Sequence, residues 1–196
     1  MIGNSHIDPV WMWRWQEGFQ EIKATFRSVL DRMKEYEAFI FTGSSASFYE
    51  WVEENDPAMF EEIKERVKEG RWIIVGGWWI QPDCNAPAGE SYVRQGLYGQ
   101  KYFEEKFGVK AVCGYNVDSF GHNGNLPQIL KKSGMDYYVF MRPGRHEKGV
   151  DGETFLWKSA DGSQVKAFRI PFEYCTWPEE IEEHVKRCAG EIKNPG

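Results

Sequence analysis

Four short apolar runs of the chain have the length of strands and end at turn-forming residues. They cover residues 38–42, 71–79, 109–117 and 136–141. The first continues into Gly43-Ser44-Ser45, and the last stops at Arg142-Pro143-Gly144. Apolar runs of this length, bounded by Gly, Ser and Pro clusters, predict buried strands.

Amphipathic runs separate these strands. Apolar residues recur at steps of three and four over residues 19–36, 57–67, 92–107 and 126–132. This period predicts helices with one buried face, and Pro57 and Gly70 fit the first turn and the end of the second helix. Strands and helices that alternate at a spacing of roughly 30 residues predict the α/β class with parallel βαβ units.

The alternation changes after Gly149. Residues 154–159 and 164–170 flank Asp161-Gly162, which predicts a β-hairpin. A last amphipathic helix is predicted over residues 179–192. No repeat, low-complexity segment or linker interrupts residues 1–196, so we expect one continuous α/β unit.

Charge, hydropathy and cysteine usage exclude several kinds of partner. The chain carries 24 Lys and Arg against 30 Asp and Glu, a net charge of −6 with no basic run, which argues against nucleic acid and anionic membrane surfaces. The longest apolar stretch, residues 72–79, is too short for a transmembrane helix, and no secretory signal is recognised. Four scattered cysteines without a Cys-x-x-Cys pair predict reduced thiols in a cytoplasmic protein.

A first cluster of polar residues stands near the start of the chain, within residues 3–9. In an extended segment, residues i and i+2 face the same side. His6 and Asp8 can therefore direct an imidazole nitrogen and a carboxylate oxygen to one point. A metal site and a structural network in which the carboxylate orients the histidine explain this pair equally well.

A second cluster follows the strand predicted over residues 109–117. The carboxyl ends of parallel strands carry the functional groups of α/β proteins, and Asp118 stands at such an end. Asp118 is a candidate third metal ligand or nucleophile; capping of the next helix is the structural alternative. His122 is expected to support the site rather than to bind a metal.

Three further side chains flank these clusters. Asp83 is a candidate for the same pocket, although a turn residue after Pro82 is the commoner explanation. Arg142 ends the fourth predicted strand and suits a clamp on a substrate oxygen. Trp11, three residues beyond Asp8, offers a ring for stacking on a sugar face, and the chain is rich in aromatic residues, with nine Trp.

Mixed histidine and carboxylate donors suit a divalent cation. Zn²⁺ is the leading candidate, and Co²⁺ or Mn²⁺ would accept the same ligands. His6, Asp8 and Asp118 supply three donors, so a fourth ligand, or water and substrate oxygens, must complete the shell.

Four motifs occur in order along the chain. Residues 3–13 read GNSHIDPVWMW, residues 76–83 read GGWWIQPD, residues 117–123 read VDSFGHN, and Met141-Arg142 follows. In this order and at this spacing they resemble glycoside hydrolase family 38, the retaining α-mannosidases. The motifs span most of the chain, and together they are far more specific than any one of them.

The resemblance implies that residues 1–196 are the N-terminal portion of the family's catalytic domain, a seven-stranded (β/α) barrel with parallel strands that is incomplete in this chain. It also implies a zinc ion held by two aspartates and two histidines. His6 and Asp8 would be ligands, and Asp118 would be both ligand and nucleophile.

The substrate implied by the resemblance is an α-mannoside or a mannose-containing oligosaccharide. Trp11, Phe120 and Arg142 would line the sugar subsite. In the family the metal binds vicinal hydroxyls of the mannose ring. Asp118 would form a covalent glycosyl-enzyme that water hydrolyses with retention, which requires a second carboxyl group about 5–5.5 Å from the nucleophile.

The chain departs from the family pattern in its extent. The resemblance implies that the family's second histidine ligand and its acid/base aspartate lie beyond Gly196, and that the family's downstream domains are not part of residues 1–196. We therefore expect a catalytic fragment that binds metal weakly and hydrolyses little by itself. The open strand edges of an incomplete barrel would also invite association into a homo-oligomer.

Two other functions remain open at this stage. A metal-dependent carbohydrate deacetylase would use a metal-activated water with Asp118 as base, and it would form no covalent intermediate. A non-catalytic sugar-binding module would use the aromatic surface and bind sugar without metal.

Overall fold

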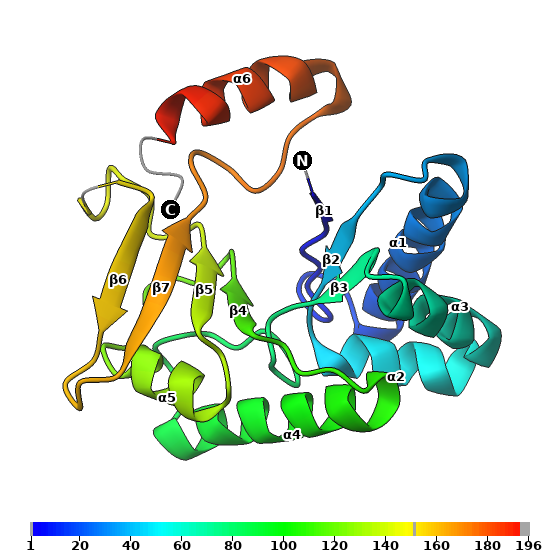
Figure 1. The fold of residues 1–196 in the computed structure, drawn as a ribbon. Helices are drawn as coiled ribbons and strands as arrows, with labels where there is room; N and C mark the ends of the chain where they lie inside the picture. Colours follow the sequence, from blue (N-terminus) through cyan, green and yellow to red (C-terminus); the bar gives the residue numbers. More distant parts are fainter. Residues whose placement is uncertain (1, 151, 193–196) are drawn as a thin grey trace.

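The computed structural model describes residues 2–150 and 152–192. Met1, Asp151 and residues 193–196, which include both ends of the predicted unit, lie outside the described residues. In chain order (Figure 1), the elements are β1 (Gly3–Asn4), α1 (Trp15–Glu35), β2 (Phe41–Gly43), α2 (Ala46–Asn55), α3 (Pro57–Lys68), β3 (Trp72–Ile74), α4 (Gly89–Phe107), β4 (Cys113–Asn116), α5 (Leu126–Lys132), β5 (Tyr137–Phe140), β6 (Thr154–Lys158), β7 (Gln164–Arg169), the 3₁₀-helix η1 (Pro178–Glu180) and α6 (Ile181–Glu191).

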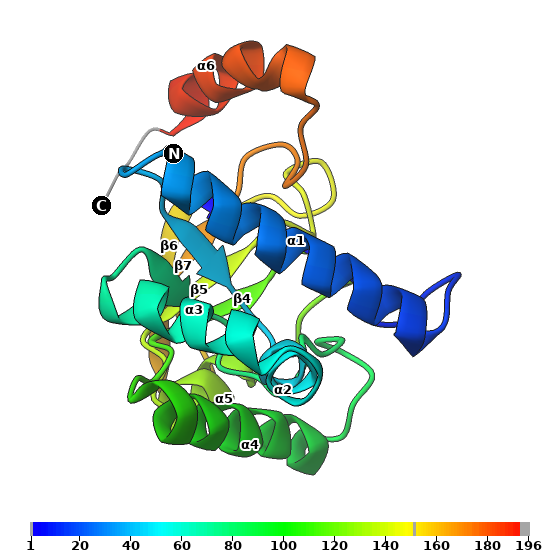
Figure 2. The same ribbon diagram turned by 90° about the vertical axis from the view of Figure 1, so that its right-hand side faces the viewer.

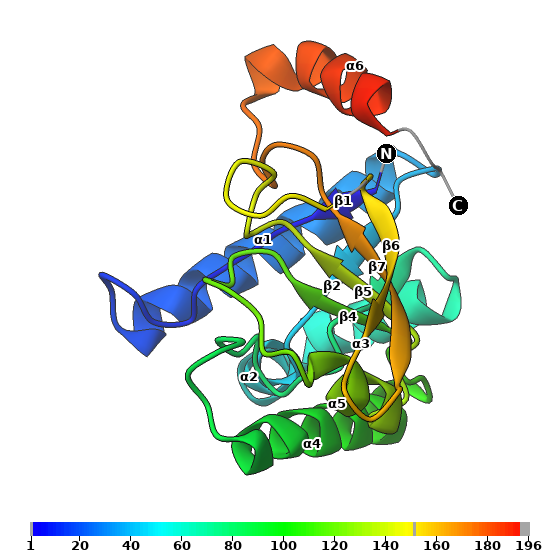
Figure 3. The same ribbon diagram turned by 90° about the vertical axis from the view of Figure 1, so that its left-hand side faces the viewer.

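Parallel strand pairing dominates the fold. One sheet has the order β1-β2-β3 with every pair parallel, and a second has the order β4-β5-β7-β6, in which β6 alone runs antiparallel. The Gly76 amide donates a hydrogen bond of 2.7 Å to the Cys113 carbonyl and so joins the two sheets. The predicted α/β class with parallel βαβ units is confirmed, as is the β6–β7 hairpin, which stands at the near edge in Figure 3.

The strands are shorter than the apolar runs that predict them. The run over residues 71–79 contributes only β3, because Gly76 and Gly77 have positive φ values of 88° and 68°. Glycine adopts this conformation readily and a strand does not, so the strand ends before Gly76. The rest of the run becomes a loop whose Trp78 is buried and donates a hydrogen bond of 3.0 Å to the Asn116 side chain.

Helix α1 begins at Trp15, four residues before the predicted start at residue 19. Glu17 makes this start favourable, because its carboxylate accepts a hydrogen bond of 2.7 Å from the Arg14 amide. The helix runs along the outside of the molecule (Figure 2), and its buried residues form one apolar face. That face consists of Phe19, Ile22, Phe26, Val29, Leu30 and Met33.

Helix α2 is an element that the hydrophobic pattern does not predict. Ser45 precedes it with a φ of 67° and no side-chain cap, so the usual sequence signals for a helix start are missing. The helix is held by burial of Phe48, Tyr49 and Val52. The Tyr49 hydroxyl also accepts a hydrogen bond of 2.9 Å from the Trp72 indole. Tertiary packing therefore determines this helix.

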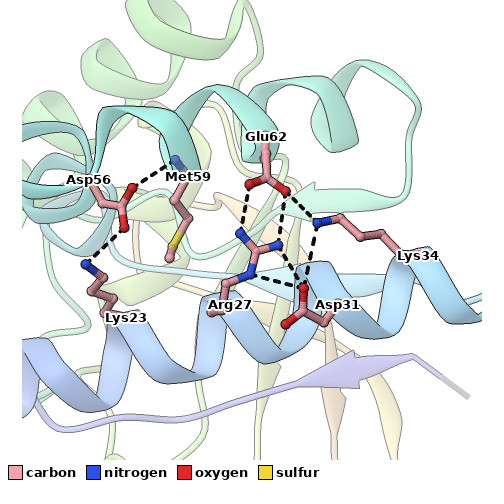
Figure 4. A network of polar contacts seen from close by, with 7 residues as sticks. All are labelled: Lys23, Arg27, Asp31, Lys34, Asp56, Met59 and Glu62. Carbon is pink, nitrogen blue, oxygen red and sulfur yellow. Dashed lines mark hydrogen bonds and ion pairs between the residues drawn. The ribbon is translucent and has the colours of Figure 1, made fainter.

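Ion pairs and hydrogen bonds connect α1 to α3 on the outside of the molecule (Figure 4). Two guanidinium nitrogens of Arg27 donate to the two carboxylate oxygens of Glu62, at 2.8 and 3.0 Å. Lys23 lies 2.9 Å from Asp56, which also caps α3 by accepting a hydrogen bond from the Met59 amide. The two helices are thus tied together at both ends of their contact.

The core is divided into a large cluster, a second cluster and a small one. The large cluster joins β2 and β3 to helices α1 to α4, and the second joins β5 and β7 to α5. The small cluster contains Val75, Tyr115, Val117 and Met141. Tyr115 donates a hydrogen bond of 2.8 Å to the Asn4 side chain, so β4 and β1 face the same interior.

Helix α6 lies at the opposite end of the molecule from α4 (Figures 1 and 2). It buries none of its side chains. Three contacts hold it over the carboxyl ends of β5 and β7: Glu191 lies 2.7 Å from Arg145, the Cys188 thiol lies 3.8 Å from the Pro171 carbonyl oxygen, and Arg187 stands over the Phe172 ring with its guanidinium carbon 4.2 Å from the centroid.

Candidate active site

His6 and Asp8, in the segment after β1, turn their side chains toward each other. His6 Nε2 lies 3.5 Å from Asp8 Oδ1. The His6 side chain is largely buried and that of Asp8 is about half exposed, at 11% and 42% accessibility. The backbone carbonyl of Asp8 accepts a hydrogen bond of 3.0 Å from the Trp13 indole, which fixes the path of this segment. The two donors therefore point to one region, as the i, i+2 spacing predicts.

Asp118, beyond the end of β4, joins this pair from the second sheet. Its Oδ2 lies 3.9 Å from His6 Nε2. Arg142, just beyond β5, brings its Nε to 2.6 Å from Asp118 Oδ1. The two groups form an ion pair, but the Arg142 N–H is not aligned on this oxygen, which is buried without a hydrogen-bond partner.

Gln81 fixes the orientation of the His6 ring, and sequence reasoning does not identify it as a site residue. Its Oε1 lies 3.0 Å from His6 Nδ1. An amide oxygen only accepts, so His6 Nδ1 carries the proton and donates. Nε2 is then left with a free lone pair, and it is buried without a hydrogen-bond partner. Gln81 lies in the GGWWIQPD motif, but the residue of this motif that the sequence predicts for the site is Asp83.

The donor set fits a divalent cation. A tetrahedral ion with bonds of about 2.0–2.1 Å separates its ligand atoms by about 3.3 Å, close to the 3.5 and 3.9 Å measured from His6 Nε2. In the described part of the chain, no three His, Cys, Asp or Glu side chains lie close enough together to form a complete metal site. The fit rests on the lone pair of His6 Nε2, which lacks a protein partner, and on the two carboxylates beside it.

Two exposed aromatic rings belong to the segments that carry the carboxylates, Trp11 to that of Asp8 and Phe120 to that of Asp118. Trp11 is 62% and Phe120 72% exposed. The Trp11 ring meets the Trp13 ring edge to face, with centroids 5.2 Å apart. Arg142 stands over the Phe120 ring with its guanidinium carbon 5.3 Å from the centroid. Both rings keep apolar area open to solvent beside the charged groups, the form that a sugar face can cover.

Asp83 is held by its own turn. Its Oδ1 accepts hydrogen bonds from the Asn85 and Ala86 amides, at 2.7 and 2.8 Å. These bonds hold the pKa of the Asp83 carboxyl below its usual range. Asp83 is therefore a turn residue, which is one of its two predicted roles. Its other predicted role, in substrate binding, stays a prediction.

Tyr174 is a second neighbour that carries no sequence motif. Its ring meets the His6 ring edge to face, with centroids 5.3 Å apart. Burial raises the pKa of its hydroxyl to about 12, and the negative charge of Asp118 acts in the same direction. The phenol is therefore neutral at physiological pH and covers one side of the site.

A cavity of about 490 Å³ lies beside Arg142, beneath α6. Charged residues line much of it, among them Arg145, Glu153 and Arg169. Glu153 and Arg169 are almost fully buried, and each leaves one side-chain atom without a hydrogen-bond partner. One unpaired acceptor and one unpaired donor suit a ligand that is rich in hydroxyl groups.

The chain is an α/β domain with parallel strands. Histidine, carboxylate and arginine side chains lie beyond the carboxyl ends of these strands and form a candidate metal and carboxylate centre. The model of the glycosyl hydrolases family 38 N-terminal domain matches residues 1–194. The chain belongs to this family. The resemblance stated from the four motifs is thus confirmed.

Two curated relatives and one solved structure illustrate the similarity. α-Mannosidase G of Dictyostelium discoideum is 34% identical over 185 residues, which are 94% of this chain and 17% of the relative. The α-mannosidase of Saccharomyces cerevisiae is 30% identical over 99% of this chain and 18% of its own length. The crystal structure of an α-mannosidase from Enterococcus faecalis V583 has a TM-score of 0.82 and 21% identity, over 98% of this chain and 23% of that one.

The chain spans less than a fifth of the length of these two curated relatives. In residues 2–150 and 152–192, no helix combines the length and the apolar character needed to cross a membrane.

Proposed function

We propose that this chain is the N-terminal part of the catalytic (β/α) barrel of a retaining α-mannosidase. The substrate would be an α-mannoside or a mannose-containing oligosaccharide. The single observation that carries the proposal is the approach of two side chains from distant segments to Asp118, whose carboxylate oxygens lie 3.9 Å from His6 Nε2 and 2.6 Å from Arg142 Nε. Membership of the family supports it.

His6 Nε2, Asp8 and Asp118 would hold the metal ion, with Zn²⁺ as the leading choice and Co²⁺ or Mn²⁺ as alternatives. A divalent cation bound there would supply a positive centre for two adjacent sugar hydroxyls. Gln81 would keep the His6 lone pair available through its hydrogen bond to Nδ1. Trp11 and Phe120 would cover the sugar face.

The chemistry would centre on Asp118. Its carboxylate would attack the anomeric carbon while the bond from that carbon to the leaving oxygen breaks, and the leaving oxygen would take a proton from a carboxylic acid. Water would then attack the same carbon and release Asp118. Arg142 stands on the Oδ1 side of the carboxylate and His6 on the Oδ2 side, so both would orient the nucleophile.

The proton donor is a separate part of the proposal. Asp83 is committed to its turn, and Asp8 lies on the metal side of His6. We assign the acid/base role, and the fourth metal ligand, to segments of the longer family members that this chain does not contain. The chain alone would then hydrolyse ordinary mannosides poorly.

A test follows from this division of roles. A 2-deoxy-2-fluoro-mannosyl donor with a fluoride or dinitrophenolate leaving group departs without protonation, so the nucleophile alone can react. The Zn²⁺-loaded chain would be incubated with this donor, digested and analysed by mass spectrometry. We expect one fluoromannosyl adduct on Asp118, formed as the bond from carbon to the leaving group breaks. Asp118→Asn is the control and should take no label.

The outcomes separate the three candidate functions. A label on Asp118 supports the glycosidase. Binding of the donor without an adduct, combined with release of acetate from an acetylated sugar, favours the deacetylase, which forms no covalent intermediate. Sugar affinity that is unchanged in Asp8→Ala with a chelator present favours the binding module.

A further inference from the structure

His122 lies in the loop that carries Asp118, and both of its ring nitrogens are engaged. Nε2 lies 2.8 Å from the backbone carbonyl oxygen of Arg142, and Nδ1 lies 3.1 Å from the Tyr138 hydroxyl. The ring meets those of Tyr138, Phe140 and Trp157 edge to face, with centroids 5.0 to 5.7 Å apart. A histidine enclosed in this way has no nitrogen left for a metal or a substrate.

The partners of His122 fix its tautomer. A carbonyl oxygen only accepts, so Nε2 carries the proton and donates to Arg142. Burial lowers the pKa of the His122 imidazole below its usual value, so the ring is neutral and Nδ1 accepts from the Tyr138 hydroxyl. The Tyr138 hydroxyl proton is then used in this bond, so its oxygen can only accept in the contact with the Cys84 sulfur 3.6 Å away, where it shares the thiol proton with the Pro82 carbonyl at 3.7 Å.

The backbone of Arg142 is held on both sides by the segment that carries Asp118. Its amide donates to the carbonyl of Val117 at 3.4 Å, and its carbonyl accepts from His122. Val117 directly precedes Asp118, and His122 follows four residues later. Only the side-chain torsions of Arg142 then remain to set the 2.6 Å approach of its guanidinium to Asp118.

Further polar contacts connect Tyr138 to Ser119, the residue that follows Asp118. The Cys84 sulfur lies 3.1 Å from the Ser119 hydroxyl and 2.9 Å from the Tyr92 hydroxyl. Cys84 and Ser119 are both buried. A continuous series of hydrogen bonds therefore runs from Ser119, beside Asp118, through Cys84, Tyr138 and His122 to Arg142.

We propose that His122 is a positioning residue for the ion pair between Arg142 and Asp118. Its Nε2–H holds the Arg142 carbonyl, and thereby places the guanidinium against the carboxylate. The inference rests on the proposed function in one respect, the role of Asp118 as the nucleophile. The ion pair that His122 positions is present whether or not Asp118 has this role.

Two substitutions separate the two hydrogen bonds of His122. In His122→Gln the side-chain amide reaches the position of Nε2 and can still donate to Arg142. In His122→Asn the shorter side chain reaches only the position of Nδ1, so the bond to Arg142 is lost. Tyr138→Phe removes the hydroxyl on the far side and leaves the imidazole in place.

The main readout is NMR of the ¹⁵N-labelled chain at pH 7. The His122 nitrogens should show a single neutral tautomer with the proton on Nε2. The Arg142 Nε resonance should be single and sharp and should carry the shift caused by the nearby Asp118 carboxylate in the wild type, in Tyr138→Phe and in His122→Gln. In His122→Asn the Arg142 Nε resonance should lose the shift caused by Asp118 and become broad. Melting curves of this variant should show that the fold is intact.

A second readout is the rate at which the fluoromannosyl donor labels Asp118. A misplacement of about 1 Å can lower such a rate by about 100-fold, and we expect a loss of this order in His122→Asn with recovery in His122→Gln. An unchanged Arg142 resonance in His122→Asn, or an imidazolium at pH 7, would overturn the inference. Absence of labelling in the wild type would count against the proposed nucleophile and leave the NMR result to decide the positioning role.

Discussion

His6 Nε2 and Asp118 Oδ2 lie 3.9 Å apart, although one follows β1 and the other follows β4. Among the residues that the structure describes, His6 Nε2 has no hydrogen-bond partner, and it carries a lone pair because the ring proton lies on Nδ1, which donates to Gln81. The lone pair of His6 Nε2 is therefore available on the side of the ring where Asp118 lies.

Gln81→Ala should weaken Zn²⁺ binding by about 10–100-fold, the usual cost of removing the partner that orients a ligating histidine. Without Gln81, the His6 ring can rotate or carry its proton on Nε2, and either change blocks the ligand atom. Isothermal titration with Zn²⁺ measures the effect. Gln20→Ala, on the exposed face of α1, is the matched control. Equal affinity in both variants would show that Gln81 does not orient His6.

Zn²⁺ should raise the thermal stability of the chain, because an ion that binds only the folded form shifts the unfolding equilibrium. At 100 times its dissociation constant the gain is about 2.7 kcal/mol. Differential scanning calorimetry with Zn²⁺, and then with excess chelator, measures the change. Asp8→Asn should lose most of the gain. A full gain in that variant would place the ion elsewhere.

Gly18→Ala should destabilise the chain by about 1–3 kcal/mol, the typical cost of overpacking. A Cβ at this position would lie 2.2 Å from the Pro9 carbonyl oxygen, a backbone atom that cannot rotate away. The clash exceeds the gain of about 1 kcal/mol that Ala usually brings to a helix. Because Pro9 follows Asp8, Zn²⁺ affinity should fall as well. Chemical denaturation and the zinc titration measure the two effects.

The control for Gly18 is Gly89→Ala in α4, where a Cβ meets nothing within 4 Å. This change should leave stability equal or slightly raised. Similar losses in both variants would mean that the loss at Gly18 does not come from the contact with Pro9.

Glu62→Gln should cost about 0.2–1 kcal/mol, the range for a partly exposed ion pair. Arg27, through its hydrogen bonds, lowers the pKa of Glu62 from 4.5 to about 2. A carboxyl with a depressed pKa in the folded state contributes stability that is full above pH 4.5 and is lost as the pH falls towards 2. The difference between wild type and variant should therefore shrink over this window. Urea unfolding at pH 7 and pH 3 tests it.

Glu61→Gln is the control for the α1–α3 ion pair. Glu61 pairs with Lys64 of its own helix at 2.9 Å and, among the described residues, makes no ion pair with α1, so its loss should cost less than that of Glu62. A difference between Glu62→Gln and wild type that grows on acidification would contradict the assignment.

Hydrophobic periodicity predicts most of the fold, and its errors have local causes. Helix α3 begins at Pro57 as predicted, and the β6–β7 hairpin forms around Asp161-Gly162. The run over residues 71–79 yields a strand of three residues, because Gly76 turns the chain. Helix α2 has no capping signal and is stabilised by distant partners such as Trp72, which no local window contains.

The candidate site is predictable only where its residues carry a motif. The spacing of His6 and Asp8 places them on one side of an extended segment, and Asp118 is found from the end of its strand. Gln81 and Tyr174 approach from loops without such a pattern, so their roles depend on the tertiary fold. The turn around Asp83 shows the opposite case, in which a polar residue at a promising position satisfies its own backbone.

The meeting of His6 and Asp118 also has a kinetic consequence. The two residues follow strands of different sheets, which are joined by a backbone hydrogen bond at Gly76, by the hydrogen bond from Tyr115 to Asn4 and by a small shared cluster of buried side chains. A site divided in this way exists only after both sheets have docked, which is expected late in folding because the contacts are far apart in sequence. A metal bound there should therefore slow unfolding and leave the folding rate nearly unchanged.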